Sequence, residues 1–409
     1  MNAKKIAEKV YWVGKVDDRK VPFHRLILER GTTYNSYLLM TDKPTIIDTV
    51  DIMFGKEYVD QLCEVIDLEK IEYIVINHVE PDHAGALPAL AARAKNAKIV
   101  ATELGVQLLK DMFKLHQREF ITIKDGDLLD VGGKTLQFFE TPFLHTEETM
   151  ITYCKEDGFL YPCDQFSTHI ATEELLNASV PESTYLEDFK VYYQLIMSPH
   201  RPYVRAMLEK LKMLEIKLIA PSHGFILNNP AQFIQIYDEL SQVENSNKKV
   251  AIVFSSMTGN TGKIAQKLAE GVEKSGVEAS IFNLNKTDLS ELTSVISEYD
   301  GILVGSSTKY GDMVGHIEEF LQSLQDQSEN AKKLSAAFGS YGWSGEAIIQ
   351  IEDYLSKAGY KVINQRYLIE GQGMDTPYFP LRIKFQREEE LETAIAAGRI
   401  FGEEVLTKV

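Results

Sequence analysis

The chain has 409 residues, of which 44% are hydrophobic, and its formal net charge at pH 7 is -17. That length exceeds one ordinary core and predicts two or three domains, while the acidic balance argues against partners that need basic surface, namely nucleic acid and anionic membranes. The three cysteines include no C-x-x-C pair, and no apolar run approaches the ~20 residues of a membrane span. A cytoplasmic protein without a targeting segment is expected.

The first part of the chain mixes strand and helix patterns. Short strands separated by Gly, Asp, Asn and Pro are expected over residues 10–50, followed by a helix at 56–66, a β-branched strand at 71–76 and a helix at 84–94. The elements predicted next are strand 98–101, helix 103–112, strands 120–123, 128–131 and 136–140, and helices 189–196, 202–214 and 230–240. Mixed strands with helices outside predict a layered α/β domain over residues 1–245.

Residues 241–249 lose apolar periodicity and are predicted to be a linker. After it, strands and helices alternate regularly. The predicted strands are 250–254, 278–283, 301–305, 333–338 and 361–370, and the helices that flank them include 261–275, 315–324, 345–358 and 388–408. Five strands each followed by a helix predict a doubly wound parallel sheet over residues 250–409.

Four potential metal ligands crowd into the segment that follows the strand at 71–76. His78, Glu80, Asp82 and His83 lie between that strand and the next predicted helix, on a strand-to-helix loop. Such a loop could be a solvated surface turn. Two imidazoles and two carboxylates at this spacing nevertheless favour a pair of metal ions.

Three more residues of the same kinds follow later strands. His145, Asp164 and His223 each come shortly after an apolar strand ends. Taken alone, a histidine in such a place is more often a turn or core residue. If the strand ends share one edge of a sheet, however, these three converge with the four earlier ones on a single metal centre.

The turn after the first strand of the second domain has the composition of an anion site. It combines hydroxyl side chains, a glycine and the start of a helix, where free N–H groups point outward. It is neither a Walker A loop nor a G-x-G-x-x-G motif, and it suits a phosphate monoester held by neutral donors, as in flavodoxins. An ordinary turn with a good helix cap is the alternative. The candidate phosphate-binding residues are Ser256, Met257, Thr258, Gly259, Asn260 and Thr261.

Two further loops at the same predicted sheet edge could flank a flavin ring. Each offers backbone donors for the ring edge and aromatic side chains for its faces, although the aromatics could also be packing residues. The three loops together resemble the phosphate-binding and ring-flanking loops of flavodoxins. The candidate ring-binding residues are Ser307, Thr308, Lys309, Tyr310, Gly311, Ser340, Tyr341, Gly342, Trp343 and Gly345.

Nearly the full chain resembles the flavodiiron proteins, also called A-type flavoproteins. That family joins an N-terminal αββα metallo-β-lactamase-like domain to a flavodoxin-like domain. Its metal motif is H-x-E-x-D-H followed by a histidine, an aspartate and a final histidine, and every position is matched here. The matching residues are His78, Glu80, Asp82, His83, His145, Asp164 and His223.

The resemblance implies a division of these ligands between two irons. One iron, nearer the flavin, would be held by His78, Glu80 and His145. Asp82, His83 and His223 would hold the other iron, with Asp164 bridging. In some relatives the residue at the His83 position turns away from the metal. Zinc hydrolases of the parent fold carry histidine at the Glu80 position, and an added anionic ligand stabilises higher-valent iron.

The resemblance also implies an activity. The chain would be a flavodiiron oxygen reductase and/or nitric oxide reductase, taking O2 to water or NO to N2O with electrons passed through FMN. The donor would be external, such as rubredoxin or a reduced deazaflavin-type cofactor, and the expected assembly is a head-to-tail homodimer or a dimer of dimers. His24, His169 and Tyr193 match positions that line the substrate pocket in relatives.

Two rival functions stay open at this point. One is a metallo-β-lactamase-fold hydrolase of the thioesterase type that carries a flavodoxin-like tail. The other is an electron carrier or redox sensor whose metal domain is structural. Glu80 and the flavin loops argue against the first, and seven ligands argue against the second, because structural sites are normally closed by four.

Overall fold

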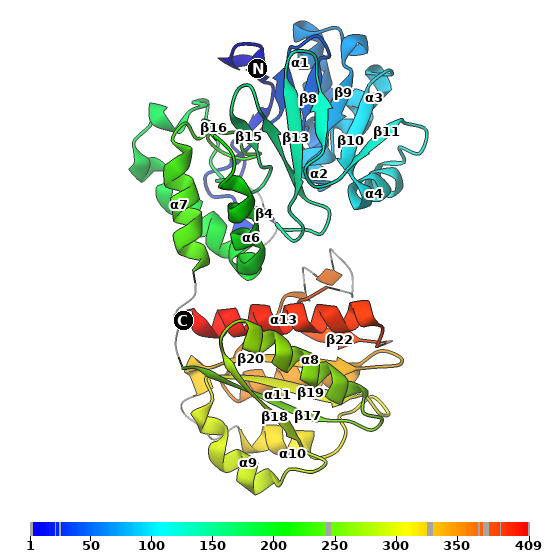
Figure 1. The fold of residues 1–409 in the computed structure, drawn as a ribbon, viewed down its shortest axis with the longest axis vertical. Helices are drawn as coiled ribbons and strands as arrows, with labels where there is room; N and C mark the ends of the chain where they lie inside the picture. The colour runs from blue at the N-terminus through cyan, green and yellow to red at the C-terminus, as the bar shows by residue number, and fades with distance from the viewer. Residues whose placement is uncertain are drawn as a thin grey trace. The chain divides into compact units, whose positions relative to one another are not determined.

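The computed structural model describes residues 3–20, 22–23, 26–242, 247–324, 330–366, 369–370, 376–384 and 386–407. The chain divides into two compact units, Met1–Gln242 and Val243–Val409 (Figure 1). No helix within these described ranges is both long enough and apolar enough to cross a lipid bilayer.

Two β-sheets form the centre of the first unit. The larger sheet has the order β1-β2-β7-β8-β9-β10-β11, and the smaller has the order β12-β13-β14-β15-β16. Their strands are β1 (Lys4–Ala7), β2 (Val10–Trp12), β7 (Tyr37–Leu39), β8 (Thr45–Ile47), β9 (Tyr73–Val75), β10 (Lys98–Thr102), β11 (Phe120–Ile123), β12 (Leu128–Asp130), β13 (Thr135–Glu140), β14 (Met150–Cys154), β15 (Phe159–Tyr161) and β16 (Leu218–Ile219). Two ribbons accompany them, β3 (Lys15–Asp17) with β6 (Thr32–Tyr34) and β4 (Pro22–Phe23) with β5 (Leu26–Ile27).

Alternating side chains explain how the two sheets pack. Tyr37 and Leu39 of β7 point into a core shared with Phe138 of the second sheet, whereas Leu38 between them points to the opposite face. That opposite face packs against α1 (Gly55–Val65), α3 (Leu87–Arg93) and α4 (Glu103–Phe113). The outer face of the second sheet packs against α5 (Leu186–Tyr192), α6 (Arg201–Leu211) and α7 (Pro230–Ser241). The result is the predicted αββα arrangement.

The described residues of the second unit form a parallel sheet. Its order is β18-β17-β19-β20-β21, and β22 also pairs with β20. Numbered by their place in this unit, the strands run 2-1-3-4-5, which is the flavodoxin-like order. One core cluster joins the sheet to α8 and α13, and another covers its opposite face with α9, α10 and α11. The elements are β17 (Lys249–Ser255), α8 (Asn260–Lys274), β18 (Glu278–Asn283), α9 (Leu289–Val295), β19 (Gly301–Ser307), α10 (Ile317–Ser323), β20 (Leu334–Ser340), α11 (Glu346–Lys357), β21 (Lys361–Val362), β22 (Leu381–Ile383) and α13 (Glu388–Leu406).

Short helical turns complete the described elements. They are α2 (Pro81–Ala84), a π-helical turn at Tyr193–Met197, and 3-10 turns at Ile52–Phe54, Leu68–Lys70, Asn177–Ser179, Glu182–Thr184, Ser198–His200, Ile296–Glu298 and Asn330–Lys332.

Two predicted elements differ from the structure. The helix predicted at 84–94 is α2 followed by α3, because Pro88 lacks an N–H and fits only in the first turn of a helix. The strand predicted at 361–370 is wrong beyond Val362. Asn364 instead donates to Glu352 of α11 at 3.0 Å, which leads the chain out of the sheet, and β22 fills the rest of that edge by pairing with β20. Part of the predicted strand, at 367–368, lies outside the described residues.

Candidate metal centre and flavin site

The seven predicted metal ligands lie on loops that leave the ends of β-strands. Four follow β9, His145 lies between β13 and β14, Asp164 follows β15 and His223 follows β16. Buried hydrogen bonds hold the start of the first loop. Asp48 accepts from Asn77 N at 2.7 Å and from Asn77 Nδ2 at 2.8 Å. Thr152 of β14 donates to Asn77 Oδ1 at 2.7 Å, so the same asparagine joins the two sheets beside the site.

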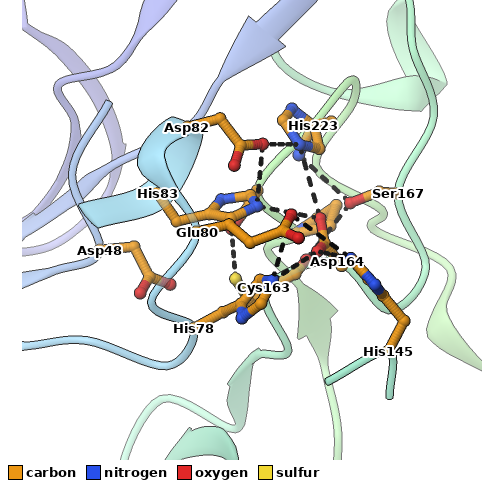
Figure 2. Close-up of polar contacts among 12 residues, drawn as sticks. Asp48, His78, Glu80, Asp82, His83, His145, Cys163, Asp164, Ser167 and His223 are labelled. Atoms are coloured by element: carbon orange, nitrogen blue, oxygen red, sulfur yellow. Dashed lines mark hydrogen bonds and ion pairs between the residues drawn. The ribbon is translucent and has the colours of Figure 1, made fainter. Parts of the chain in front are cut away.

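The side chains of all seven residues converge (Figure 2). They form two groups, and within each group the potential ligand atoms lie within 4.8 Å of one another. All seven are buried except Glu80, which is partly exposed. The first group is His78, Glu80, His145 and Asp164, and the second is Asp82, His83 and His223.

The Asp164 carboxylate lies between the two groups. Its Oδ2 is 3.6 Å from Nε2 of His78 and 3.2 Å from Nε2 of His145. Its Oδ1 is 3.1 Å from Nε2 of His83 and 3.5 Å from Nε2 of His223. Each oxygen therefore faces a different group, as a bridging ligand requires.

His83 faces the centre rather than away from it. Its Nε2 lies 3.1 Å from Oδ2 of Asp82, and the same Asp82 oxygen is 3.2 Å from Nε2 of His223. The second group thus offers two imidazoles and a carboxylate of its own.

The charges in the site are those of a cation-binding centre. Burial opposes protonation of His145, yet Glu80 and Asp164 outweigh it and raise its pKa to about 9. Burial likewise opposes ionisation of Asp164, but the facing histidines hold its pKa well below the usual range. Protons here balance carboxylates in close contact, and metal cations could replace them.

The donor set fits two iron ions. Nε2 of His78, Nε2 of His83 and Oδ2 of Asp82 are buried, and their contacts within the described part of the chain are with other potential ligand atoms of the centre, without hydrogen-bond geometry. Buried polar atoms of this kind point to a missing ligand. Each group supplies two imidazoles and one carboxylate, with Asp164 shared, and mixed imidazole and carboxylate ligation is typical of non-haem iron.

Sequence analysis did not predict the groups that contact the outer ring nitrogens of the metal-facing histidines. Glu148 Oε1 accepts from His78 Nδ1 at 2.7 Å, and the Thr33 carbonyl lies 2.6 Å from His223 Nδ1. Burial raises the pKa of Glu148, but the charge of His78 and the hydrogen bonds to the carboxylate lower it overall, to about 2. The closeness of Glu148 to His145 in the sequence was the available signal.

The three predicted pocket residues have different surroundings. His24 lies outside the described residues. His169 is beside the second group: its Nδ1 is 2.9 Å from Thr32 Oγ1 and its ring centroid is 4.7 Å from that of His223. Tyr193 is buried, with its ring 4.8 Å from the ring of Tyr237.

Tyr192, the residue before Tyr193, contacts the metal centre. Burial raises the pKa of Tyr192 well above its usual range, and the charge of Asp164 and a hydrogen bond to it act in the same direction. Its ring also makes an edge contact with His169, with centroids 5.0 Å apart. Sequence analysis named Tyr193 and not Tyr192; both are buried on the same helical segment.

In the second unit, the predicted phosphate loop leads directly into a helix. Gly259, at φ +86°, precedes the first residue of α8, and no side chain caps this helix. The Gly259 N–H donates to Ser256 Oγ at 3.0 Å, and a side chain added at Gly259 would meet nothing within 4 Å. Open space before uncapped helical N–H groups fits a phosphate.

Hydroxyl groups tie the three predicted flavin loops together. Thr261 Oγ1, at the start of α8, lies 2.9 Å from Ser307 Oγ and 2.9 Å from Ser340 Oγ. These residues mark the ends of β19 and β20 next to the start of α8. The neighbouring ends of β17 and β19 are where the strand order reverses, which is where ligands bind in sheets of this type.

The predicted ring-binding residues expose surface that a flat ligand would cover. Tyr310 is 97% exposed and Trp343 is 92% exposed, and Met257 of the predicted phosphate loop is 51% exposed. Thr308 Oγ1 is buried and has no hydrogen-bond partner among the residues described. An apolar platform with a few polar groups fits FMN.

Each unit of the chain matches the model of a known protein family. The ODP family beta lactamase model matches residues 32–224, and the flavodoxin model matches residues 252–398. An anaerobic nitric oxide reductase flavorubredoxin from Vibrio vulnificus (strain YJ016) is 36% identical over 365 residues, which are 87% of this chain and 73% of the relative.

Solved structures are similar over almost the whole chain. The flavodiiron protein from Giardia intestinalis matches with a TM-score of 0.60 and 28% identity, covering 99% of this chain and 97% of the other. Rubredoxin oxygen:oxidoreductase from Desulfovibrio gigas matches with a TM-score of 0.59 and 28% identity, covering 99% and 98%. From these matches and from the site described above, we conclude that the chain belongs to the flavodiiron protein family.

Proposed function

We propose that this protein is an oxidoreductase that reduces O2 to water, NO to N2O, or both, using two iron ions in the first unit and FMN in the second. The observation that carries the proposal is the Asp164 carboxylate, with one oxygen toward each of two ligand groups. A two-metal hydrolase could share a carboxylate in the same way, so the flavodoxin unit is what favours an oxidoreductase.

The residues that would hold the irons are the seven that converge. His78, Glu80 and His145 would bind one ion, Asp82, His83 and His223 the other, and Asp164 would bridge them. Glu80 supplies an anionic oxygen where zinc hydrolases of this fold carry histidine, which favours iron.

The residues that would hold FMN are those of the three loops. The amides at the start of α8 and the hydroxyl of Thr261 would bind the phosphate, and Tyr310 and Trp343 would cover the ring. The Thr308 hydroxyl, for which the described residues offer no partner, would bond to a polar edge of the ring.

When bound, the pair of ferrous ions would supply two electrons and reduced FMN two more. Conversion of O2 to two waters uses four electrons and four protons. Conversion of two NO to N2O and water uses two electrons and two protons. The protein's own part is to bind and orient. His169 and Tyr192 lie against the second group and Asp164, where they can donate hydrogen bonds to a bound substrate.

The electron donor and the assembly are further parts of the proposal. The similar structure from Desulfovibrio gigas is called a rubredoxin oxygen:oxidoreductase, which supports a rubredoxin-type donor, and a reduced deazaflavin-type cofactor is the other candidate. A head-to-tail homodimer, or a dimer of such dimers, would bring the flavin of one subunit to the irons of the other. The cytoplasm is the proposed location, in line with three cysteines that lack a C-x-x-C pair.

The hydrolase alternative loses its support. Both units match oxidoreductases along nearly their whole length, and the flavodoxin match covers the part that a hydrolase would not use. An electron carrier with a structural metal domain is disfavoured by the number of ligands, because closed structural sites use four.

Purified protein tests the proposal. A yellow protein with two irons per chain that consumes O2 or NO when reduced rubredoxin is supplied supports it. A colourless zinc protein that cleaves thioesters would refute it. Steady-state rates for both gases with one donor would then show which substrate is preferred.

A further inference from the structure

The outer nitrogen of His78 contacts a carboxylate, whereas the outer nitrogen of His223 contacts a backbone carbonyl. His78 Nδ1 lies 2.7 Å from Oε1 of Glu148, and the Val79 N–H donates to the same oxygen at 3.0 Å. Thr146 Oγ1 lies 3.1 Å from the same Nδ1. Because Oε1 already accepts from the Val79 N–H, the Nδ1 that faces it donates, so His78 carries its proton on Nδ1 and turns the lone pair of Nε2 toward the ligand group.

The corresponding contact in the second group is neutral. His223 Nδ1 faces the Thr33 carbonyl at 2.6 Å, with Thr32 Oγ1 at 3.3 Å. The ring of His83 contacts the Cys163 thiol. Asp48 interacts electrostatically with His83 more than with His78, but burial raises the pKa of its carboxyl and both of its oxygens accept hydrogen bonds from Asn77.

Glu148 also joins the two loops of the first group. It is 6% exposed and lies on the same β13–β14 loop as His145, while its carboxylate reaches the loop that carries His78. Thr102 Oγ1 donates to the Glu148 carbonyl at 2.9 Å, which fixes the backbone at that point. One side chain therefore sets the separation of two ligands.

We propose that Glu148 is a positioning residue that makes the iron held by His78, Glu80 and His145 the one with the lower reduction potential. This rests on the proposed function. An anionic acceptor on the outer nitrogen makes an imidazole a stronger donor, and a stronger donor stabilises the ferric ion. The neutral acceptor on His223 strengthens that imidazole less and so stabilises the ferric ion less. The two irons should therefore differ in reduction potential.

The variant Glu148→Gln separates charge from geometry. Its amide oxygen can still accept from His78 Nδ1 and from Val79 N, whereas the negative charge is gone. In a redox titration of the iron-loaded protein followed by electron paramagnetic resonance, we expect both irons to remain and one of the two one-electron steps to move to more positive potential, with the other step moving less. The gap between the two steps therefore shrinks.

The variant Glu148→Leu removes the acceptor as well. Outer partners of metal-bound histidines typically contribute roughly 10- to 100-fold to metal affinity, so iron binding at the first group should weaken by about that factor. Iron content after dialysis against a chelator measures this, and circular dichroism establishes that the variant is folded.

The matched control is Glu103→Gln. Glu103 is exposed and lines the same cavity of about 600 Å³ as Glu148, so the substitution removes one charge from the same wall without touching His78. It should leave both potentials unchanged. An equal shift in the control, or unchanged potentials in Glu148→Gln, overturns the inference. A wild-type protein without two irons would instead overturn the proposed function, so the two failures are distinguishable.

Discussion

At the scale of single residues, Asp164 organises the metal centre. Its two carboxylate oxygens face different histidine pairs at 3.1 to 3.6 Å, and it is buried among them. Sequence spacing predicted this residue correctly as one of seven that converge. The direction in which each oxygen points depends on how the two sheets pack, and no local pattern contains that information.

Replacing Asp164 by alanine should remove iron and leave the flavin. Both ligand groups lose a carboxylate in Asp164→Ala, whereas the FMN loops lie in the other unit of the chain. We expect iron to fall below one per chain while the FMN content stays at the wild-type value, measured by elemental analysis and by flavin absorbance. The exposed helical residue Asp111, changed to alanine, serves as the control. Retention of both metals would show that Asp164 is not a bridge.

Glu80 should determine which metal is bound. Glu80→His gives the first group a third imidazole in place of a hard oxygen ligand, so zinc should be favoured over iron. Cells grown with both metals should yield a variant with a lower iron-to-zinc ratio than the wild-type protein, and flavin content should be unaffected. An unchanged ratio would mean that Glu80 does not select the metal.

At the scale of elements, loops at strand ends carry both predicted sites. The β17–α8 turn and the ends of β19 and β20 meet through the Thr261, Ser307 and Ser340 hydroxyls. Composition predicted these loops because glycine, hydroxyl residues and a helix start are needed together to bind a phosphate. Their hydrogen bonds to one another could not be predicted, since they depend on the strand order.

Removing the Thr261 hydroxyl should weaken FMN binding. Thr261→Val keeps the shape of the side chain but loses the hydroxyl proposed to bind the phosphate. A hydrogen bond to a charged group contributes about 1.5–3 kcal/mol, so the Kd for FMN should rise roughly tenfold or more. Quenching of FMN fluorescence by apoprotein measures it. Thr293→Val in α9, where the hydroxyl donates to the helix carbonyl of Leu289 and lies 3.4 Å from Ser323 Oγ, should leave the Kd unchanged. Equal affinities for the Thr261→Val variant and the wild-type protein would exclude a role for this hydroxyl.

The elements that sequence analysis missed have common physical causes. The edge strand predicted at 361–370 is interrupted because Asn364 binds Glu352, a contact between residues of different elements. The contact of Tyr192 with Asp164 was not predicted either, because it depends on how that helical segment packs against the metal centre. Both outcomes depend on tertiary packing rather than on local propensity.

At the scale of the whole molecule, function requires the two units to exchange electrons. The chain holds its candidate iron ligands in Met1–Gln242 and its candidate flavin loops in Val243–Val409. The proposed head-to-tail dimer makes a specific prediction about which flavin serves which irons.

Two inactive variants should restore each other's activity. Asp164→Ala lacks iron, and Gly259→Val should lack FMN, because a β-branched residue is strained at φ +86° and would fill the phosphate loop. When both are produced in the same cells, a mixed dimer pairs an intact flavin with intact irons, so NO or O2 reduction should reappear. Activity no greater than the sum of the separate variants would show that electrons pass within one chain.

The measurement that tests the central claim most directly is a count of electrons in one turnover. Protein that has been fully reduced under anaerobic conditions, separated from its donor and mixed with a limiting series of O2 concentrations should consume one O2 per chain. Flavin and both irons should be reoxidised together and no hydrogen peroxide should form, because two irons and one FMN hold four electrons. Peroxide as the product, or reoxidation of flavin with no change at iron, would contradict the account.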